Sequence, residues 1–330
     1  MKKNKIFACI LPFLSVCLAS CSGSGVHHDA KEYFVDVDYK TDFKILQLTD
    51  LHLTMEDDLN YHLKFVDLTI KDANPDFIIC TGDIFTFATT HVMDTLFNFF
   101  ESHKIPWGVT FGNHDEQTYF SIKTLTGNLN SKYEYCKFID IQDDDVYGNA
   151  NYIVNINKDG KAKYQLVVLD SNRYEYTNGY GYDNFHQDQV DWYERVVKYS
   201  TEKNGYVVPS LAFFHIPFEE YGIAYNLYKQ GSGLVTHHYG ENREGIACSR
   251  KESQMFEKMV ELGSTKACFV GHDHINNSDI TYQGIELVFG IKATDRVYAD
   301  KDMMGGLTIT IHDDNSYTID RIYHTYEEVK

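Results

Sequence analysis

The chain has 330 residues, 43% hydrophobic and 24% charged, and this composition indicates a large packed core rather than an intrinsically disordered chain. Lys and Arg total 30 against 48 Asp and Glu, so the formal charge of -18 argues against general attraction to nucleic acid or to an anionic membrane surface. With 22 Gly, 5 Pro and no fixed-period repeat, the sequence also excludes collagen-like and solenoid proteins.

The N-terminal segment predicts export. Lys2, Lys3 and Lys5 precede a short apolar run, so residues 1–20 have the pattern of a signal peptide rather than of a membrane span. The run ends in Leu-Ala-Ser-Cys at Cys21, which resembles the bacterial lipobox, in which the cysteine is acylated and becomes the new N-terminus. The alternative is an ordinary secreted protein cut near Ala19.

This pattern sets the expected organisation of the chain. We predict a lipoprotein signal peptide over 1–20, a tether and N-terminal segment over 21–39, and a single domain over 40–330, because no linker divides the remainder. The protein would be exported and anchored by lipid to the bacterial cell envelope, on its periplasmic or surface face. The cysteines beyond the signal do not form a disulfide framework, although a bridge between Cys136 and Cys248 stays open.

Strand-like and helical patterns alternate along the first half of the domain. Apolar strand patterns cover 43–48, 76–80 and 105–111, with helical patterns at 61–73 and 91–102 between them. This order predicts a mostly parallel sheet covered by helices, in which functional loops follow the carboxyl ends of strands.

The second half adds antiparallel hairpins to this pattern. Strands are predicted at 151–156, 164–169, 210–214, 267–270, 280–282, 285–289, 307–311 and 316–321, and helices at 187–202 and 251–262. The last four strands look like a closing antiparallel run. Together the elements predict an α/β fold of two packed mixed β-sheets flanked by helices, a four-layer αββα sandwich.

Five short polar motifs follow predicted strands. They are Asp50-Leu51-His52, Gly82-Asp83, Gly112-Asn113-His114-Asp115, His215 after Phe214, and Gly271-His272-Asp273-His274. Each motif alone is weak, since a single histidine after a strand is more often hydrogen-bonded within the structure than a ligand. Their common position at strand ends makes a shared site the better explanation.

The order of the motifs resembles the calcineurin-like metallophosphoesterase superfamily over residues 43–292. Within it, Leu169-Asp170-Ser171, the Gly-Tyr run ending at Tyr182 and the helix with Trp192 look like the phosphatases related to plant purple acid phosphatase 29. Purple acid phosphatases proper have a Tyr three residues after the bridging Asp, where this chain has Thr86. A tyrosinate-bound ferric centre is therefore not expected.

The resemblance implies a dinuclear metal centre. It places Asp50, His52 and His274 on one ion, Asn113, His215 and His272 on the other, and Asp83 between them. Imidazole, carboxylate and amide ligands suit divalent or trivalent ions of the Mn, Fe, Zn or Co class rather than calcium. Two divalent ions with two aspartates keep about two positive charges, which attract an anion such as a phosphate.

His114 has a different role in the family, that of donating a proton to the leaving oxygen, with Asp115 orienting its ring. A carboxylate partner is a physical reason for the imidazole to titrate near the working pH. Three further residues are candidate substrate contacts: Arg243 for a phosphate, and Asn172 and Tyr174 as lining of the cleft. A Tyr-rich loop also packs without any such role.

The sequence therefore predicts a dinuclear phosphoric ester hydrolase, most simply a phosphomonoesterase on a phosphorylated small molecule, in which water held between the ions attacks phosphorus in line. One alternative is a phosphodiesterase acting on cyclic nucleotides, lipid head groups or nucleic acid. An alternative from another class is a non-catalytic lipoprotein that binds a phosphorylated ligand. The His114-Asp115 pair favours the enzyme, because a binding site needs no proton donor.

Overall fold

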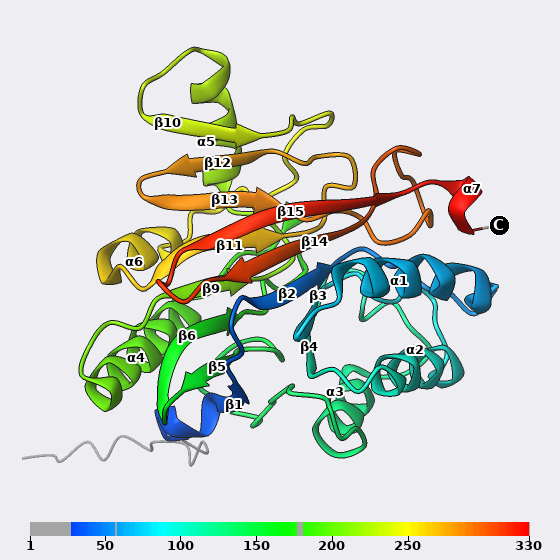
Figure 1. The fold of residues 1–330 in the computed structure, drawn as a ribbon, viewed down its shortest axis with the longest axis horizontal. Helices are drawn as coiled ribbons and strands as arrows, with labels where there is room; N and C mark the ends of the chain where they lie inside the picture. Colours follow the sequence, from blue (N-terminus) through cyan, green and yellow to red (C-terminus); the bar gives the residue numbers. More distant parts are fainter. Residues whose placement is uncertain (1–27, 57, 177–180, 330) are drawn as a thin grey trace, which may run out of the picture.

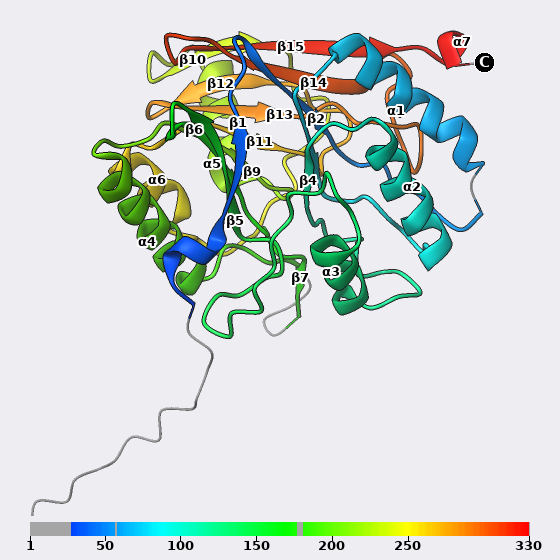
Figure 2. The same ribbon diagram turned by 60° about the horizontal axis from the view of Figure 1, so that its bottom comes forward.

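The computed structural model describes residues 28–56, 58–176 and 181–329. Two mixed β-sheets pack face to face between helices (Figures 1 and 2). The expected α/β fold of two packed sheets flanked by helices is confirmed. The signal peptide predicted over 1–20 and the lipidated Cys21 lie outside the described residues.

The larger sheet has eight strands. In spatial order they are β1 (Phe34–Asp38), β5 (Tyr152–Lys158), β6 (Lys161–Val168), β9 (Ser210–Phe213), β11 (Thr265–Val270), β13 (Ile285–Phe289), β12 (Asp279–Tyr282) and β10 (Val235–Tyr239). β6, β9, β11 and β13 run parallel to one another, while β5 pairs with β6 as the predicted antiparallel hairpin. A separate short hairpin joins β7 (Tyr174–Glu175) and β8 (Gly181–Tyr182).

The smaller sheet has five strands, in the order β15 (Tyr317–His324), β14 (Met304–Ile311), β2 (Phe43–Leu48), β3 (Phe77–Thr81) and β4 (Trp107–Thr110). β2, β3 and β4 are parallel, and β14 and β15 close the sheet in antiparallel fashion. The helices are α1 (Leu59–Ala73), α2 (Thr90–Ser102), α3 (Ile122–Ser131), α4 (Gln187–Asn204), α5 (Glu219–Lys229), α6 (Met255–Leu262) and α7 (Tyr326–Val329), with a 3-10 turn η1 at Ala30–Tyr33.

Alternation along the central strands builds the layers. Phe213 of β9 and Phe269 of β11 face the smaller sheet and stack at 5.1 Å between ring centroids. Ala212 and Cys268 face the opposite way, into a second core that also contains Trp192 of α4 and Met255 of α6. Because side chains alternate across a strand, each apolar strand fills two cores at once.

Helix α1 shows how the outer layer forms. Its first turn is capped by the Asp58 side chain, which accepts the backbone N–H of Tyr61, and it ends at Asn74 in a left-handed conformation. Val66 and Ile70, one turn apart, are buried against the smaller sheet. The helix therefore covers one face of that sheet and leads the chain from β2 to β3.

Several elements differ from the sequence-based expectation. β1 lies before residue 40, in the segment expected to be a tether, and pairs with β5, so the ordered domain extends further toward the N-terminus. α6 begins four residues later than the helix predicted from 251, and α3, α5 and β10 were not predicted. The closing strands also divide between the sheets, with β12 and β13 in the larger and β14 and β15 in the smaller.

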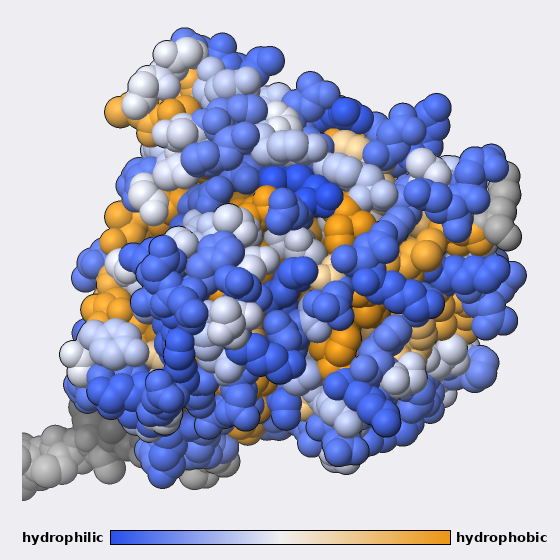
Figure 3. Space-filling model, viewed as in Figure 1, coloured by the Kyte–Doolittle hydropathy of each residue, from blue (hydrophilic) through white to orange (hydrophobic). Residues whose placement is uncertain are grey.

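The visible surface (Figure 3) is mostly hydrophilic, and the cysteines of the described residues are free. Hydrophilic residues predominate on the face seen in Figure 3, with hydrophobic residues between them. In the described ranges, no helix has both the length and the apolar composition needed to cross a membrane. Cys136 and Cys248 are free, so the disulfide that the sequence left open is not formed.

Candidate metal centre

The five motifs meet where the two sheets adjoin. Asp50 and His52 follow β2, Asp83 follows β3, and Asn113 and His114 follow β4 of the smaller sheet. His215, and the pair His272 and His274, follow the parallel strands β9 and β11 of the larger sheet. Strands remote in sequence therefore deliver their carboxyl-end loops to one place, as the motif positions predicted.

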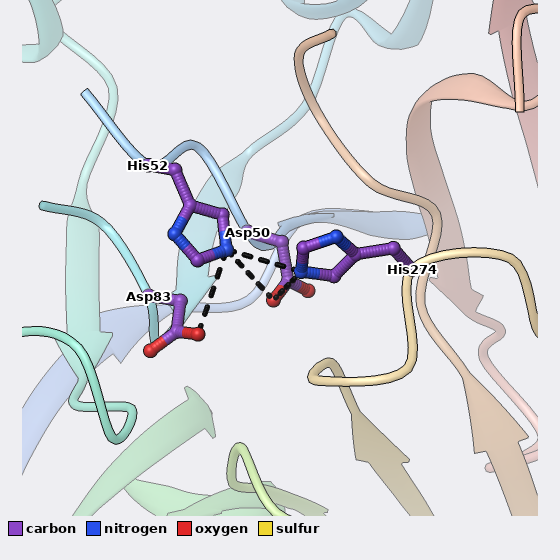
Figure 4. A group of neighbouring side chains, drawn as sticks. All are labelled: Asp50, His52, Asp83 and His274. Atoms are coloured by element: carbon purple, nitrogen blue, oxygen red, sulfur yellow. Dashed lines mark hydrogen bonds and ion pairs between the residues drawn. The ribbon is translucent and has the colours of Figure 1, made fainter. Parts of the chain in front are cut away.

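The first group consists of Asp50, His52, Asp83 and His274, all buried (Figure 4). His274 Nε2 lies 3.4 Å from Asp50 Oδ1, and His52 Nε2 lies 3.5 Å from Asp83 Oδ2. The two imidazole Nε2 atoms face each other at 3.0 Å. Two carboxylates and two imidazole nitrogens thus converge on a space the size of one cation.

The second group consists of Asp83, His215 and His272. His215 Nε2 lies 3.2 Å from Asp83 Oδ2, the same oxygen that faces His52. Asp83 is the member common to both groups, which is the geometry of a carboxylate between two ions. The cluster of Asp and His side chains fits two metal ions.

Backbone carbonyls fix the tautomers of the histidines. His215 Nδ1 lies 2.8 Å from the carbonyl oxygen of Thr81, and His274 Nδ1 lies 2.9 Å from that of Tyr298. A carbonyl only accepts, so both Nδ1 atoms carry a hydrogen and both Nε2 atoms face the site, where each offers a lone pair to a cation once its ring is neutral. His52 Nδ1 is similarly engaged by the Thr86 hydroxyl at 2.9 Å.

Buried polar atoms without a partner support the second ion position. Asn113 Oδ1, His215 Nε2 and His272 Nε2 are buried and have no hydrogen-bond partner in the described structure. Asn113 Nδ2 donates a hydrogen bond to the Tyr174 hydroxyl at 2.8 Å, and this bond orients the Asn113 amide. Since an unpaired buried polar atom is costly, a cation is the natural partner of these three atoms.

The ligand loops are held in unusual backbone conformations. Asp50, His52, Asp83 and His272 all have positive φ, between 47° and 74°. For residues other than glycine each such conformation costs on the order of 1 kcal/mol or more and persists where surrounding structure enforces it. Gly271 is required for close approach, because a Cβ there would lie 2.0 Å from Thr49 Oγ1.

Residues 292–294 support the strained loop after β2. The backbone N–H of Ala293 donates to the Thr49 carbonyl at 2.9 Å, and the Thr294 hydroxyl donates to the Leu51 carbonyl at 2.8 Å. Between them, Lys292 Nζ donates to the Asp50 carbonyl at 2.6 Å. Three successive carbonyls are thereby satisfied, and a buried ammonium lies behind the two metal-facing aspartates.

Burial and charge perturb the titration of this cluster in opposite directions. Burial lowers the pKa of His272 to about 3 and that of Lys292 to about 8. Burial alone would also lower the pKa of His215, but the carboxylates of Asp83 and Asp50 raise it to about 9. The pKa of Asp83 falls well below its usual value because His215 and neighbouring imidazoles outweigh its burial. The pKa of Asp50 is lowered as well, because His274 and other nearby positive groups outweigh its burial, so both carboxylates are anionic.

His114 is oriented by a residue other than the one expected. Its Nδ1 lies 2.8 Å from Gln117 Oε1, while its Nε2 points toward the site, 4.0 Å from Asp83 Oδ2. Asp115 instead accepts the backbone N–H groups of Phe85 and Gly112, so its predicted contact with the His114 ring is wrong. Burial, followed by the charge of Asp83, raises the pKa of Asp115 to about 7.

The other predicted contacts have different environments. Asn172 lines a cavity that Gly112 and Arg173 also line, and its side-chain amide donates to the Asn184 carbonyl and to Gln189 Oε1. Arg243 is bound by the carboxylates of Glu241 and Asp300, with which a phosphate would have to compete. Tyr174 lies in the site, where its hydroxyl accepts a hydrogen bond from the side-chain amide of Asn113, a candidate metal ligand.

Sequence reasoning missed Gln117, Lys292 and Tyr182. The Tyr182 ring stands edge-on to His272, with 4.5 Å between centroids. Gln117 lies three residues after His114, a spacing that would have suggested the contact. No motif marks Lys292, because its role depends on a parallel backbone bridge between residues 49 and 292.

A family model described as calcineurin-like phosphoesterase matches residues 43–276. The chain belongs to this family. Its fold is that of a dimetal phosphatase from Danio rerio, with a TM-score of 0.58, 15% identity and coverage of 87% of this chain and 100% of that structure. The predicted superfamily is confirmed, and with it the expectation of a metal-dependent phosphoesterase fold.

The curated relatives include plant and yeast proteins. The chain is 28% identical to "Probable inactive purple acid phosphatase 29" of Arabidopsis thaliana over 292 residues, covering 76% of this chain and 71% of the relative. It is 27% identical to "Phosphatase DCR2" of Saccharomyces cerevisiae over 285 residues, covering 75% of this chain and 47% of that protein. The resemblance to plant purple acid phosphatase 29 thus extends over most of the domain.

Proposed function

We propose that this protein is a dinuclear-metal phosphomonoesterase. The observation that carries the proposal is that Asp83 Oδ2 faces both His52 Nε2 and His215 Nε2, with ligand-type atoms on either side. Bound there, two cations of the Mn, Fe, Zn or Co class would supply positive charge for the phosphoryl oxygens and an activated water for in-line displacement. Asp50, His52 and His274 would hold one ion, and Asn113, His215 and His272 the other.

His114 is the proton donor in this proposal. The Gln117 amide oxygen accepts the hydrogen on Nδ1, and Nε2 is left facing the space beside Asp83. An imidazolium with its second proton on Nε2 gives that proton to the departing alkoxide, which otherwise leaves poorly. The side chain is about a third exposed, so water can restore the proton after each turnover.

A panel of two esters tests the activity. Protein loaded with Mn, or with Fe and Zn, is expected to hydrolyse p-nitrophenyl phosphate faster than the bis ester. His114→Ala should lower kcat by about 100-fold or more with metal content unchanged. Faster cleavage of the bis ester would favour a phosphodiesterase, and metal-loaded protein that cleaves neither ester would contradict the hydrolase.

A second candidate is a non-catalytic protein that binds a phosphorylated ligand. It is favoured by the curated name of the Arabidopsis relative, which describes that protein as probably inactive. Against it stands the ordered His114–Gln117 pair, for which a binding site has no use. Metal-dependent binding of inorganic phosphate without any turnover would decide for the binder.

We further propose export and lipid anchoring at Cys21. The support is the signal-like segment 1–20 and the lipobox resemblance in the sequence. The full chain expressed in a bacterium should fractionate with membranes, and Cys21→Ser should release it from them. Equal membrane association of the two chains would contradict the anchor.

A further inference from the structure

Large apolar side chains stand exposed on the loops around the candidate metal centre. They are Met55, Phe87, Tyr119, Val297 and Tyr298, called here the apolar rim. The first three follow β2, β3 and β4 on the same loops that carry Asp50, Asp83 and Asn113, and the last two lie on the loop between β13 and β14. Large apolar groups that gather exposed around a site indicate a contact with something apolar.

Hydrogen bonds join the first three loops to one another. Phe87 donates its backbone N–H to the Gln117 carbonyl at 2.6 Å, and Tyr119 donates to the Ala88 carbonyl at 2.9 Å. Thr86 donates its N–H to the Leu53 carbonyl, which brings the loop of Met55 beside that of Phe87. The three loops that carry these exposed apolar residues are therefore joined side by side.

The rim also contacts the histidines of the site. Tyr298 stacks on His274, with 4.2 Å between ring centroids, and its carbonyl accepts the His274 Nδ1 hydrogen. Phe87 directly follows Thr86, whose hydroxyl is bonded to His52. Since the His52 and His274 rings lie 4.9 Å apart, Phe87 and Tyr298 flank the same pair of candidate ligands.

Two rim residues occupy conformations that their side chains disfavour. Phe87 has φ 51° and Val297 has φ 65°, and a β-branched residue is a genuine outlier there. Their side chains are 56% and 63% exposed, so burial in the described structure does not repay the strain. Strain of this kind beside a site points to a function of the side chain.

We propose that the apolar rim binds the alcohol part of the substrate, so that the preferred phosphoesters are those of aliphatic or aromatic alcohols. This inference rests on the proposed phosphomonoesterase function. The phosphoryl group would lie at the cations, and the adjoining apolar chain or ring would cover Phe87, Val297 and Tyr298. A bilayer is a weaker occupant, because the formal charge of -18 disfavours an anionic membrane surface.

Ethyl phosphate and n-hexyl phosphate test the rim, since their leaving alcohols are alike and they differ by four methylene groups. We expect kcat/KM to be about tenfold higher for the hexyl ester. This factor corresponds to burying roughly half of the apolar surface of its four additional methylene groups. In the double variant Phe87→Asn with Val297→Asn the ratio should fall close to one. Asparagine tolerates positive φ, so the loops should keep their shape, and a thermal melt checks this.

Leu234→Asn is the matched control, because Leu234 is 72% exposed but precedes the edge strand β10. It should leave the ester ratio unchanged. Equal kcat/KM for the two esters in the unaltered protein, or an unchanged ratio in the double variant, would overturn the proposal. So would vesicle binding: if the Cys21→Ser chain sediments with phosphatidylcholine vesicles and the double variant does not, the rim contacts membrane. Hydrolysis of neither ester would instead count against the phosphomonoesterase itself.

Discussion

Replacing Lys292 by Met removes the buried ammonium behind the metal centre while filling most of its volume. The Asp50 carbonyl loses its 2.6 Å donor and stays buried, and both metal-facing aspartates lose a nearby positive charge. Removing one partner of a buried charged cluster typically costs about 3 to 5 kcal/mol. Part of this is returned, because the lysine no longer has to be desolvated, so we expect about 3 kcal/mol of lost stability in metal-free protein.

Thr294→Val is the matched variant, because it removes only neutral hydrogen bonds: the one its hydroxyl donates to the neighbouring Leu51 carbonyl, and a longer one it accepts from the Arg296 N–H. Its expected cost is about 1 kcal/mol. At roughly 2 °C per kcal/mol for a chain of this size, Lys292→Met should lower Tm by about 6 °C and Thr294→Val by about 2 °C. Bound cations supply positive charge to the same aspartates, so metal should shrink the deficit of Lys292→Met and leave that of Thr294→Val unchanged.

Thermal melts of the unaltered chain and both variants, in EDTA and in excess Mn, measure these differences. Metal content by mass spectrometry confirms that each loaded sample carries ions. If Lys292→Met melts with the same deficit in EDTA and in Mn, then the lysine acts through its hydrogen bond alone and the countercharge reasoning is refuted.

Three further predictions concern the site and the sheet. Gly271→Ala places a Cβ against Thr49 Oγ1, so elemental analysis should find the bound metal reduced by half or more. Full metal occupancy would show that the loop shifts to accommodate the methyl group without losing the site. Gln117→Leu frees the His114 ring and should lower kcat about tenfold at unchanged metal content. Loss of metal instead would mark Gln117 as structural. Burial, and after it a neighbouring carboxylate, raises the pKa of Glu286 in the folded protein to about 7, against about 4.5 in the unfolded chain. The protonated side chain therefore stabilises the fold fully below pH 4.5, and this contribution is lost as the pH rises through 7. Glu286→Gln should therefore gain about 1 to 2 kcal/mol over the unaltered chain between pH 5 and pH 8 in urea unfolding with EDTA, and a pH-independent difference would contradict the shift.

Local pattern was sufficient for the central strands and the long helices. β2 and β13 occupy the residues predicted, because short segments rich in apolar residues and bounded by turn residues have few other solutions. β1 was not predicted because two of its five residues, Phe-Val-Asp-Val-Asp, are charged and the strand gains its stability by pairing with β5, more than a hundred residues away. β10 is likewise an edge strand with polar residues, His238 among them exposed, and it depends on pairing with β12.

The sequence by itself determined the members of the candidate site, since motif order and strand-end position named every residue of the two clusters around Asp83. Tertiary structure alone decided how those residues are held. Gln117 rather than Asp115 orients His114, Lys292 satisfies the Asp50 carbonyl, and the apolar rim gathers from four loops. The physical reason is one of range: a ligand's type and its strand are properties of a few adjacent residues, whereas a hydrogen-bond partner or a shared surface exists only after remote backbone segments have packed together.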